Sequence, residues 1–80
     1  QYDIIYIDGS HHFEDVYLDA ENSLSRLKEN GIIIFDDFLK KHYMNLEKDP
    51  LIAILKFINK HKKNIKIINV NYQIIIKKIK

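Results

Sequence analysis

Two short apolar runs, each ended by aspartate, constrain the fold of this chain more than any other feature. Residues 4–7 form the first run and stop at Asp8, and residues 32–35 form the second and stop at Asp36 and Asp37. Short, β-branched and nearly continuous apolar runs are typical of parallel strands buried on both faces. A helical pattern separates them, so we expect a right-handed crossover between neighbouring or near-neighbouring parallel strands. The three aspartates would then emerge side by side at the carboxyl edge, where open α/β sheets bind ligands.

Three carboxylates at one edge repel one another unless a proton or a cation compensates their charge. A hard divalent cation is the simplest solution, because Mg2+ takes one or two carboxylates and keeps several waters. The pattern therefore predicts a metal site formed by Asp8, Asp36 and Asp37. Two other interpretations stay open: Asp8 as the cap of the following helix, and Asp36 with Asp37 as an ordinary polar turn.

The spacing of apolar residues predicts two helices. In the first, over about residues 13–29, one face would carry Phe13, Val16, Tyr17, Ala20, Leu24 and Leu27. Asn30 and Gly31 form a stop signal after it, with Gly31 suited to the left-handed position. The second helix follows an irregular stretch over residues 38–48 and starts at Asp49, as N-cap, and Pro50. Its apolar stripe would be Leu51, Ile54, Leu55 and Ile58.

The C-terminal segment predicts two strands, over residues 65–70 and 74–79. Too few residues separate them for a parallel crossover, so this pair must be antiparallel. The expected fold is α/β, in the order β-α-β-α-β-β. Two crossovers in the same direction place both helices on one face of the sheet. We therefore expect the other face, and the edge beside the first strand, to be covered by residues before Gln1 or by a partner, self-association included.

Composition excludes several classes of function. Eighty residues make at most one domain, and a net charge of +2 is too weak to indicate nucleic acid. The chain has no cysteine, no apolar run long enough to span a membrane and no signal peptide. We therefore expect a cytoplasmic protein without nucleic-acid or membrane partners. Because the chain opens directly on strand-like residues without a methionine, we also expect that it was cut from a longer one.

Three segments carry a family resemblance. They are Asp-Gly-Ser-His-His-Phe-Glu-Asp-Val at residues 8–16, Gly-Ile-Ile-Ile-Phe-Asp-Asp-Phe at residues 31–38, and Tyr-Gln-Ile-Ile-Ile-Lys-Lys at residues 72–78. Together they resemble the C-terminal half of a class I S-adenosylmethionine-dependent methyltransferase with a Rossmann-like sheet. The metal-dependent small-molecule O-methyltransferases, which include macrolide-sugar enzymes of the macrocin type, are the most similar. The resemblance implies one partial domain over residues 1–80.

The resemblance also implies roles for single residues. Asp8, Asp36 and Asp37 match positions that ligate a divalent metal, usually Mg2+. His11 matches a general base that takes the proton of the acceptor hydroxyl on a small-molecule substrate. Asp8, Gly9, Ser10 and His12 would contact S-adenosylmethionine. A helix-start histidine bonded to backbone is the alternative for His11, and a structural or supporting role is the alternative for His12.

One feature of the family is missing from the chain. Members of the family hold the cofactor chiefly by a glycine-rich loop, whereas this chain has only two glycines, Gly9 and Gly31. The chain would therefore hold the metal and substrate half of a site, and alone it should bind S-adenosylmethionine poorly. His42 and Tyr43 follow the aspartate pair in the sequence, and this position is the only reason to expect that they face the substrate. The alternatives to methyl transfer are a metal-dependent hydrolase and a non-catalytic remnant that serves only for association.

Overall fold

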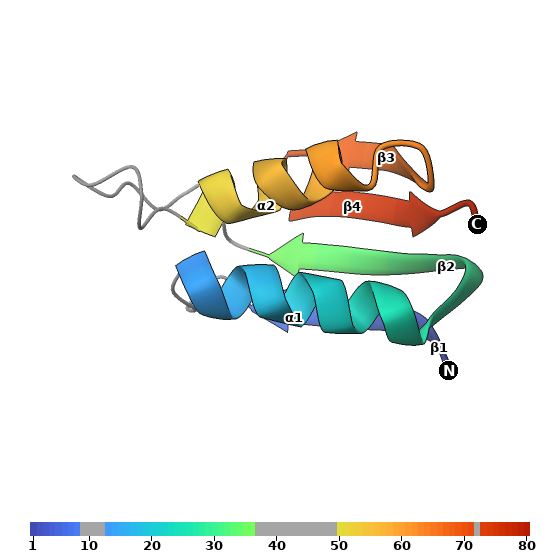
Figure 1. Cartoon of the computed structure of the whole chain (residues 1–80). Coiled ribbons are helices and arrows are strands. Elements are labelled where there is room, and N and C mark those ends of the chain that lie inside the picture. The colour runs from blue at the N-terminus through green and yellow to red at the C-terminus, as the bar shows by residue number, and fades with distance from the viewer. Residues whose placement is uncertain (9–12, 37–49, 72) are drawn as a thin grey trace.

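The computed structural model describes residues 1–8, 13–36, 50–71 and 73–80, which form a four-stranded sheet and two helices (Figure 1). The elements in chain order are β1 (Tyr2–Asp8), α1 (Phe13–Arg26), β2 (Leu27–Asp36), α2 (Pro50–Lys60), β3 (Ile65–Val70) and β4 (Gln73–Lys78). Neither helix of the described chain is long and apolar enough to cross a membrane.

The sheet is mixed, with the strand order β1-β2-β4-β3. β1 and β2 are parallel neighbours, as the two apolar runs predicted, and Ile5 is paired with Ile33 and Ile7 with Phe35. β4 lies between β2 and β3 and is antiparallel to both. The antiparallel pairing of the last two strands, expected from their short connection, is therefore observed.

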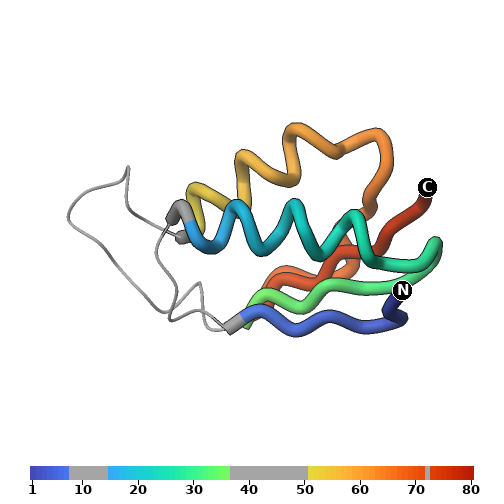
Figure 2. The backbone as a smooth tube through the Cα atoms, turned by 60° about the horizontal axis from the view of Figure 1, so that its bottom comes forward, coloured from blue at the N-terminus to red at the C-terminus, as the bar shows by residue number. Residues whose placement is uncertain are grey.

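Both helices lie on the same face of the sheet, as Figure 2 shows. The core lies between that face and the helices, and Phe35 and Phe57 are its largest fully buried side chains. Their rings meet edge to face, with centroids 6.2 Å apart. The other buried hydrophobic residues of the described chain are Ile7, Val16, Ala20, Leu24, Leu27, Ile33, Ala53, Ile54, Ile65, Ile74 and Ile76.

The opposite face of the sheet, which we call the bare face, is apolar and open. Ile4 and Tyr6 of β1 lie there and are 60% and 56% exposed. Ile34, the register partner of Tyr6, and Ile75, the partner of Ile34 on β4, are half-buried beside them. Within the described part of the chain no helix covers this face (Figure 2). The expectation that both helices cover one face alone is confirmed.

The end of α1 differs from its prediction. The helix stops at Arg26 rather than Glu29, and residues 27–30 already belong to β2. Leu27 pairs with Tyr2 of β1 and is 1% exposed, so strand pairing overrides the helical pattern there. The left-handed residue is Asn30, with φ 70°, and not Gly31. Asparagine tolerates that conformation better than most other residues.

α2 begins at Pro50, as predicted, but its buried stripe is shifted. Leu55 was expected in the stripe and is 50% exposed. Ala53 and Phe57 are fully buried instead, on either side of the buried Ile54. The cause is that Phe57 fills the space against Phe35, which turns Leu55 toward solvent. Asp49 and residues 38–48 lie outside the described residues.

A polar contact joins the two helices, and we call it the α1–α2 clamp (Glu21, Lys60 and His61). His61 Nε2 lies 3.0 and 3.1 Å from the two carboxylate oxygens of Glu21. Lys60 Nζ lies 3.1 Å from Oε1 of the same carboxylate. Burial raises the pKa of Glu21, but the hydrogen bonds and charges of His61 and Lys60 outweigh it, so the net pKa lies below its usual value.

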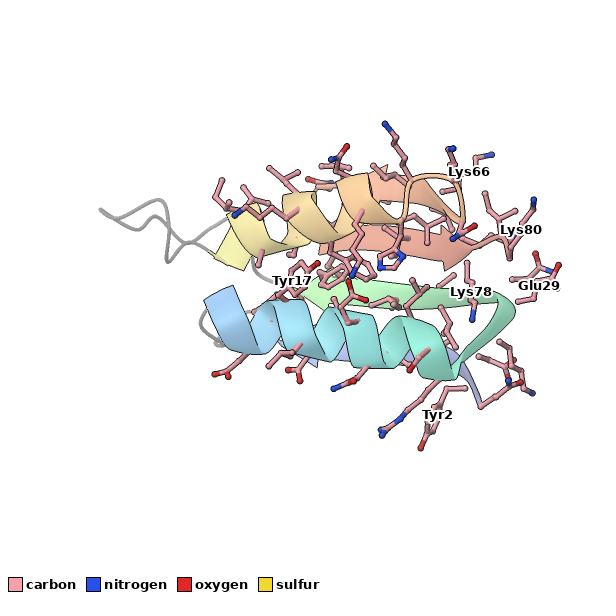
Figure 3. The ribbon with its side chains drawn as sticks, viewed as in Figure 1. Tyr2, Tyr17, Glu29, Lys66, Lys78 and Lys80 are labelled. Atoms are coloured by element: carbon pink, nitrogen blue, oxygen red, sulfur yellow. The ribbon has the colours of Figure 1, made fainter. Side chains whose placement is uncertain are left out.

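A lysine from β4 closes the C-terminal end of α1. Lys78 Nζ donates hydrogen bonds to the carbonyl oxygens of Leu24, at 3.0 Å, and Leu27, at 2.9 Å. Figure 3 shows Lys78 pointing toward that end of the helix. Carbonyls in the last turn of a helix have no partner within it, and a cation there also complements the helix dipole.

Candidate functional site

The carboxyl ends of β1 and β2 bring two of the predicted metal ligands to neighbouring backbone positions. Asp8 is the last residue of β1, Asp36 is the last residue of β2, and the two are partners in the parallel register. The two apolar runs end at the same level because Ile7 pairs with Phe35 one step earlier. The backbones of Asp8 and Asp36 therefore lie side by side, as their positions at the ends of the two apolar runs predict.

Asp36 also contacts a residue that sequence reasoning did not assign to the site. The Tyr6 hydroxyl donates a hydrogen bond to Oδ2 of the half-buried Asp36 carboxylate. Tyr6 lies on the bare face of β1, and its bond crosses from β1 to β2. A signal for it was present, because Tyr6 stands two residues before Asp8 and residues two apart share a face of a strand.

A second residue missed from the sequence is Gln73. It is half-buried, begins β4 and is the register partner of Asp36 on the side away from β1. Asp8, Asp36 and Gln73 therefore form a row across three adjacent strands, which we call the carboxyl-edge row. Its only sequence signal is a polar residue at the start of an otherwise apolar run. That signal becomes specific only once β4 is known to lie beside β2.

The remaining predicted site residues lie outside the described residues. They are Gly9, Ser10, His11, His12, Asp37, His42 and Tyr43. Two of the three predicted metal ligands are thus placed by backbone position. Across residues 1–8, 13–36, 50–71 and 73–80, no group of three or more histidine, cysteine, aspartate or glutamate side chains gathers to hold a metal.

The chemistry of the carboxyl-edge row suits a hard cation. Magnesium takes one or two carboxylates and fills its other positions with water or substrate oxygens. The backbone register brings two aspartate positions and one glutamine position together, and both residue types carry oxygen ligands of that kind. The hydrogen bond from Tyr6 restrains the orientation of the Asp36 carboxylate.

Comparison with known proteins gives one match, to a family model that covers the first part of the chain. Residues 1–38 match the model of a family described as a methyltransferase domain. The matched part contains β1, α1 and β2, and therefore both aspartates of the row. The searches of curated proteins and of solved structures each found no match.

Proposed function

We propose that this chain supplies the metal and acceptor half of an S-adenosylmethionine-dependent methyltransferase that acts on a hydroxyl of a small molecule. The observation that carries the proposal is the pairing of Asp8 with Asp36 at the carboxyl ends of two parallel strands. Those strands lie in the part of the chain that matches a methyltransferase domain family. The edge where they end is also where α/β sheets bind their ligands.

In this proposal Asp8, Asp36 and Asp37 bind a divalent cation, and Tyr6 holds the Asp36 carboxylate through its hydroxyl. His11 accepts the proton of the acceptor hydroxyl, whose oxygen then bonds to the transferred methyl carbon. The carbon–sulfur bond breaks, and its electron pair stays on the sulfur. When bound, the cation would lower the pKa of the hydroxyl, and S-adenosylmethionine would supply the methyl group.

The chain offers less for the methyl donor than for the acceptor. With two glycines in eighty residues, it has no glycine-rich loop to hold S-adenosylmethionine. The proposal therefore gives Asp8, Gly9, Ser10 and His12 only a share of the donor contacts. The enzyme that contains this chain would draw the rest from other segments.

The metal part is tested by titrating Mn2+ into the chain and recording free Mn2+ by electron paramagnetic resonance. We expect one site that Mg2+ displaces, and an affinity at least about tenfold weaker in Asp36→Asn, because the ligand loses its charge. Asp3→Asn is the matched control, since Asp3 lies on β1 far from the row and is 80% exposed in its side chain. Equal binding by all three proteins would overturn the metal site.

The catalytic part is tested in the enzyme that contains this chain, by methyl transfer from labelled S-adenosylmethionine to small hydroxyl compounds. His11→Ala should lower the rate by roughly a hundred- to ten-thousandfold, the usual contribution of a general base. Donor affinity, measured by calorimetry, should stay nearly unchanged. A wild-type rate in His11→Ala would remove this residue from the mechanism.

A further inference from the structure

The side of the molecule formed by α2 and β3 carries apolar side chains. On α2, Leu51, Leu55 and Ile58 follow the i, i+4 and i+7 spacing of one helical face. Lys60, which forms an ion pair with Glu21 of α1, lies about two and a half turns after Leu51 and therefore on the opposite side of the helix. The apolar face of α2 thus turns away from α1 and lies toward the β3 end of the sheet (Figure 1).

β3 continues this apolar surface at the edge of the sheet. Ile67 pairs with Ile76 of β4, which is fully buried beneath the helices, so Ile67 faces the side on which α2 lies. Val70 faces the same side, because its partner Ile74 is buried there as well. Ile67, Ile68 and Val70 are 45%, 52% and 60% exposed. We call the apolar residues of the two elements the α2–β3 strip: Leu51, Leu55, Ile58, Ile67, Ile68 and Val70.

The charges around the strip have one sign. Residues 50–80 contain eight lysines and no aspartate or glutamate, whereas nine of the eleven acidic residues lie in residues 1–37. Lys62 and Lys63, in the turn between α2 and β3, are exposed at one end of the strip. Lys66 is exposed on β3 itself, and Figure 3 shows it at the outer edge of the sheet, on the side away from α1. The strip is therefore an apolar surface bordered by cations.

The edge of β3 carries two features that oppose pairing with a further strand. Its register with β4 shifts between Ile67 and Asn69, so Ile68 forms a bulge. Bulges and lysines such as Lys66 are devices by which edge strands avoid pairing with another chain. A second copy of this chain would also bring a second set of lysines to the same side, where like charges repel. A strand from another chain is therefore a poor occupant of this side.

The chemistry of the strip also distinguishes between polyanions. Sites for single-stranded nucleic acid stack bases on aromatic side chains, whereas every residue of the strip is aliphatic. An anionic lipid surface offers a partner to both parts of this side. Apolar side chains enter the boundary between headgroups and acyl chains, and lysines beside them are attracted by the anionic headgroups.

We propose that the α2–β3 strip docks the protein on an anionic lipid surface, with Lys62, Lys63 and Lys66 against the headgroups. Such a contact lies on the membrane and needs no spanning helix. The net charge of +2 predicts no membrane partner, but it is a sum over an acidic and a basic part of the chain. The fold separates these parts and gathers lysines beside exposed aliphatic side chains.

Docking through this side is compatible with the rest of the molecule. α2 and β3 follow one another in the chain, and β3 stands at the opposite end of the sheet order from β1. The segments expected beside β1 and on the bare face therefore have their places elsewhere. The carboxyl-edge row ends at Gln73 of β4 and also stays uncovered. The inference does not rest on the proposed methyl transfer.

Sedimentation with lipid vesicles measures the contact in the enzyme that contains this chain. We expect binding to mixed phosphatidylglycerol and phosphatidylcholine vesicles that weakens with salt, and little binding to pure phosphatidylcholine. Lys62→Glu with Lys63→Glu should lower the partition coefficient at least about tenfold, because each lysine near such a surface contributes about fivefold. Arg26→Glu with Lys28→Glu, the same charge change at exposed residues on the β1 side, should bind nearly as well as the unchanged enzyme.

A second pair of variants tests the apolar part. Leu55→Ser, in the strip and 50% exposed, should lower the partition coefficient about threefold or more, since binding scales with the apolar area that enters the membrane. Leu18→Ser, on α1 and 59% exposed, is the matched control and should have no effect. Binding that persists in Lys62→Glu with Lys63→Glu would overturn the inference. Equal binding to polyglutamate or to an RNA oligonucleotide that persists in Leu55→Ser would also overturn it, because the partner would then be a polyanion and not a lipid surface.

Discussion

At the scale of single residues, Gly31 is required for close packing rather than for a turn. It is buried in β2 and does not have a positive φ, since the left-handed residue is its neighbour Asn30. A Cβ on Gly31 would stand 2.8 Å from Leu27 Cδ1 and 2.9 Å from the backbone oxygen of Lys28. The side chain could shift, but the backbone oxygen belongs to the start of the same strand. Any larger residue at this position therefore requires the backbone to shift.

We predict that Gly31→Ala lowers the free energy of unfolding by about 1–3 kcal/mol, the usual cost of overpacking a tight site. Urea unfolding followed by circular dichroism measures it. Lys62→Ala, at an exposed turn residue, is the control and should change the value by less than about 0.5 kcal/mol. A neutral Gly31→Ala would show that residues 27–31 rearrange at little cost.

Tyr6 gives a second prediction at this scale, which rests on the proposed metal site. Tyr6→Phe removes the hydroxyl that holds the Asp36 carboxylate and leaves the ring in place. Loss of such a supporting bond commonly weakens metal binding about ten- to a hundredfold. The Mn2+ titration should detect this change, whereas Tyr2→Phe, on the same strand and 56% exposed, should bind like the wild type. Equal affinity in both variants would leave Tyr6 without a role at the site.

The sequence could predict part of the carboxyl-edge row but not all of it. The neighbouring positions of Asp8 and Asp36 could be predicted, because each residue ends an apolar run. Two runs of equal length in parallel strands are expected to end at the same edge of the sheet. The position of Gln73 beside Asp36 could not be predicted, because it depends on β4 lying between β2 and β3 rather than at the edge of the sheet. The role of Tyr6 could be predicted only in part. The two-residue period of a strand puts Tyr6 on the same face as Asp8, but its hydrogen bond to Asp36 follows only from the pairing of β1 with β2 in the structure.

At the scale of elements, the α1–α2 clamp links helix packing to pH. The pKa of Glu21 lies below its usual value of 4.5 in the folded chain, so folding favours the ionised carboxylate. The resulting stability is fully present above about pH 4.5 and is lost as the pH falls through the lowered pKa. The pKa of Lys60 shifts in the opposite direction, because its hydrogen bond and ion pair with Glu21 raise it above the usual value of 10.5. The stability that the charged Lys60 contributes is therefore lost only at strongly alkaline pH.

We predict that the free energy of unfolding falls more steeply below pH 4.5 in the wild type than in Glu21→Gln. The difference should be about 1 kcal/mol or less, because the pair is partly exposed. Urea unfolding at steps between neutral pH and about pH 3 measures both slopes. Glu29→Gln, at an exposed strand residue outside the clamp, should keep the wild-type slope. Parallel curves for wild type and Glu21→Gln would show that ionisation of Glu21 adds no stability to the fold.

Element types were easier to predict than element ends. The helical spacing of α1 and the apolar runs of the strands are local, and they gave the correct type for every described element. The end of α1 was wrong because Leu27 pairs with Tyr2, twenty-five positions away in the sequence. The stripe of α2 was wrong at Leu55 because Ala53 and Phe57 fill the space against the sheet. Both errors arise where a long-range contact decides between local alternatives.

At the scale of the whole molecule, the described residues form two layers, a sheet and the helices on one of its faces. The apolar sequences of β1 and β2 are typical of strands in three-layer folds, in which helices cover both faces. A chain of this size buries only about 60–65% of its unfolded surface, so its margin of stability is narrow. The bare face keeps Ile4 and Tyr6 exposed and leaves Ile34 and Ile75 half-buried. Self-association through this face was predicted from the strand pattern and stays a prediction.

Two neighbouring isoleucines of β2 make the exposure of the bare face testable. Ile33 faces the helices and is fully buried, whereas Ile34 faces the other way and is half-buried. We predict that Ile33→Thr lowers the free energy of unfolding by about 2–3 kcal/mol, since it leaves a cavity and buries a hydroxyl. Ile34→Thr keeps a β-branched side chain at the surface and should cost less than about 1 kcal/mol.

The same two variants also test whether the bare face of one chain associates with that of another. Ile34→Thr should reduce the binding of a hydrophobic dye and the concentration dependence of the thermal transition, because it makes the bare face more polar. Ile33→Thr should lower the transition temperature without removing that dependence. If Ile34→Thr is as destabilising as Ile33→Thr at every concentration, then some part of the protein covers the bare face. The β2 strand would in that case be buried on both sides, as its unbroken run of apolar residues first indicated.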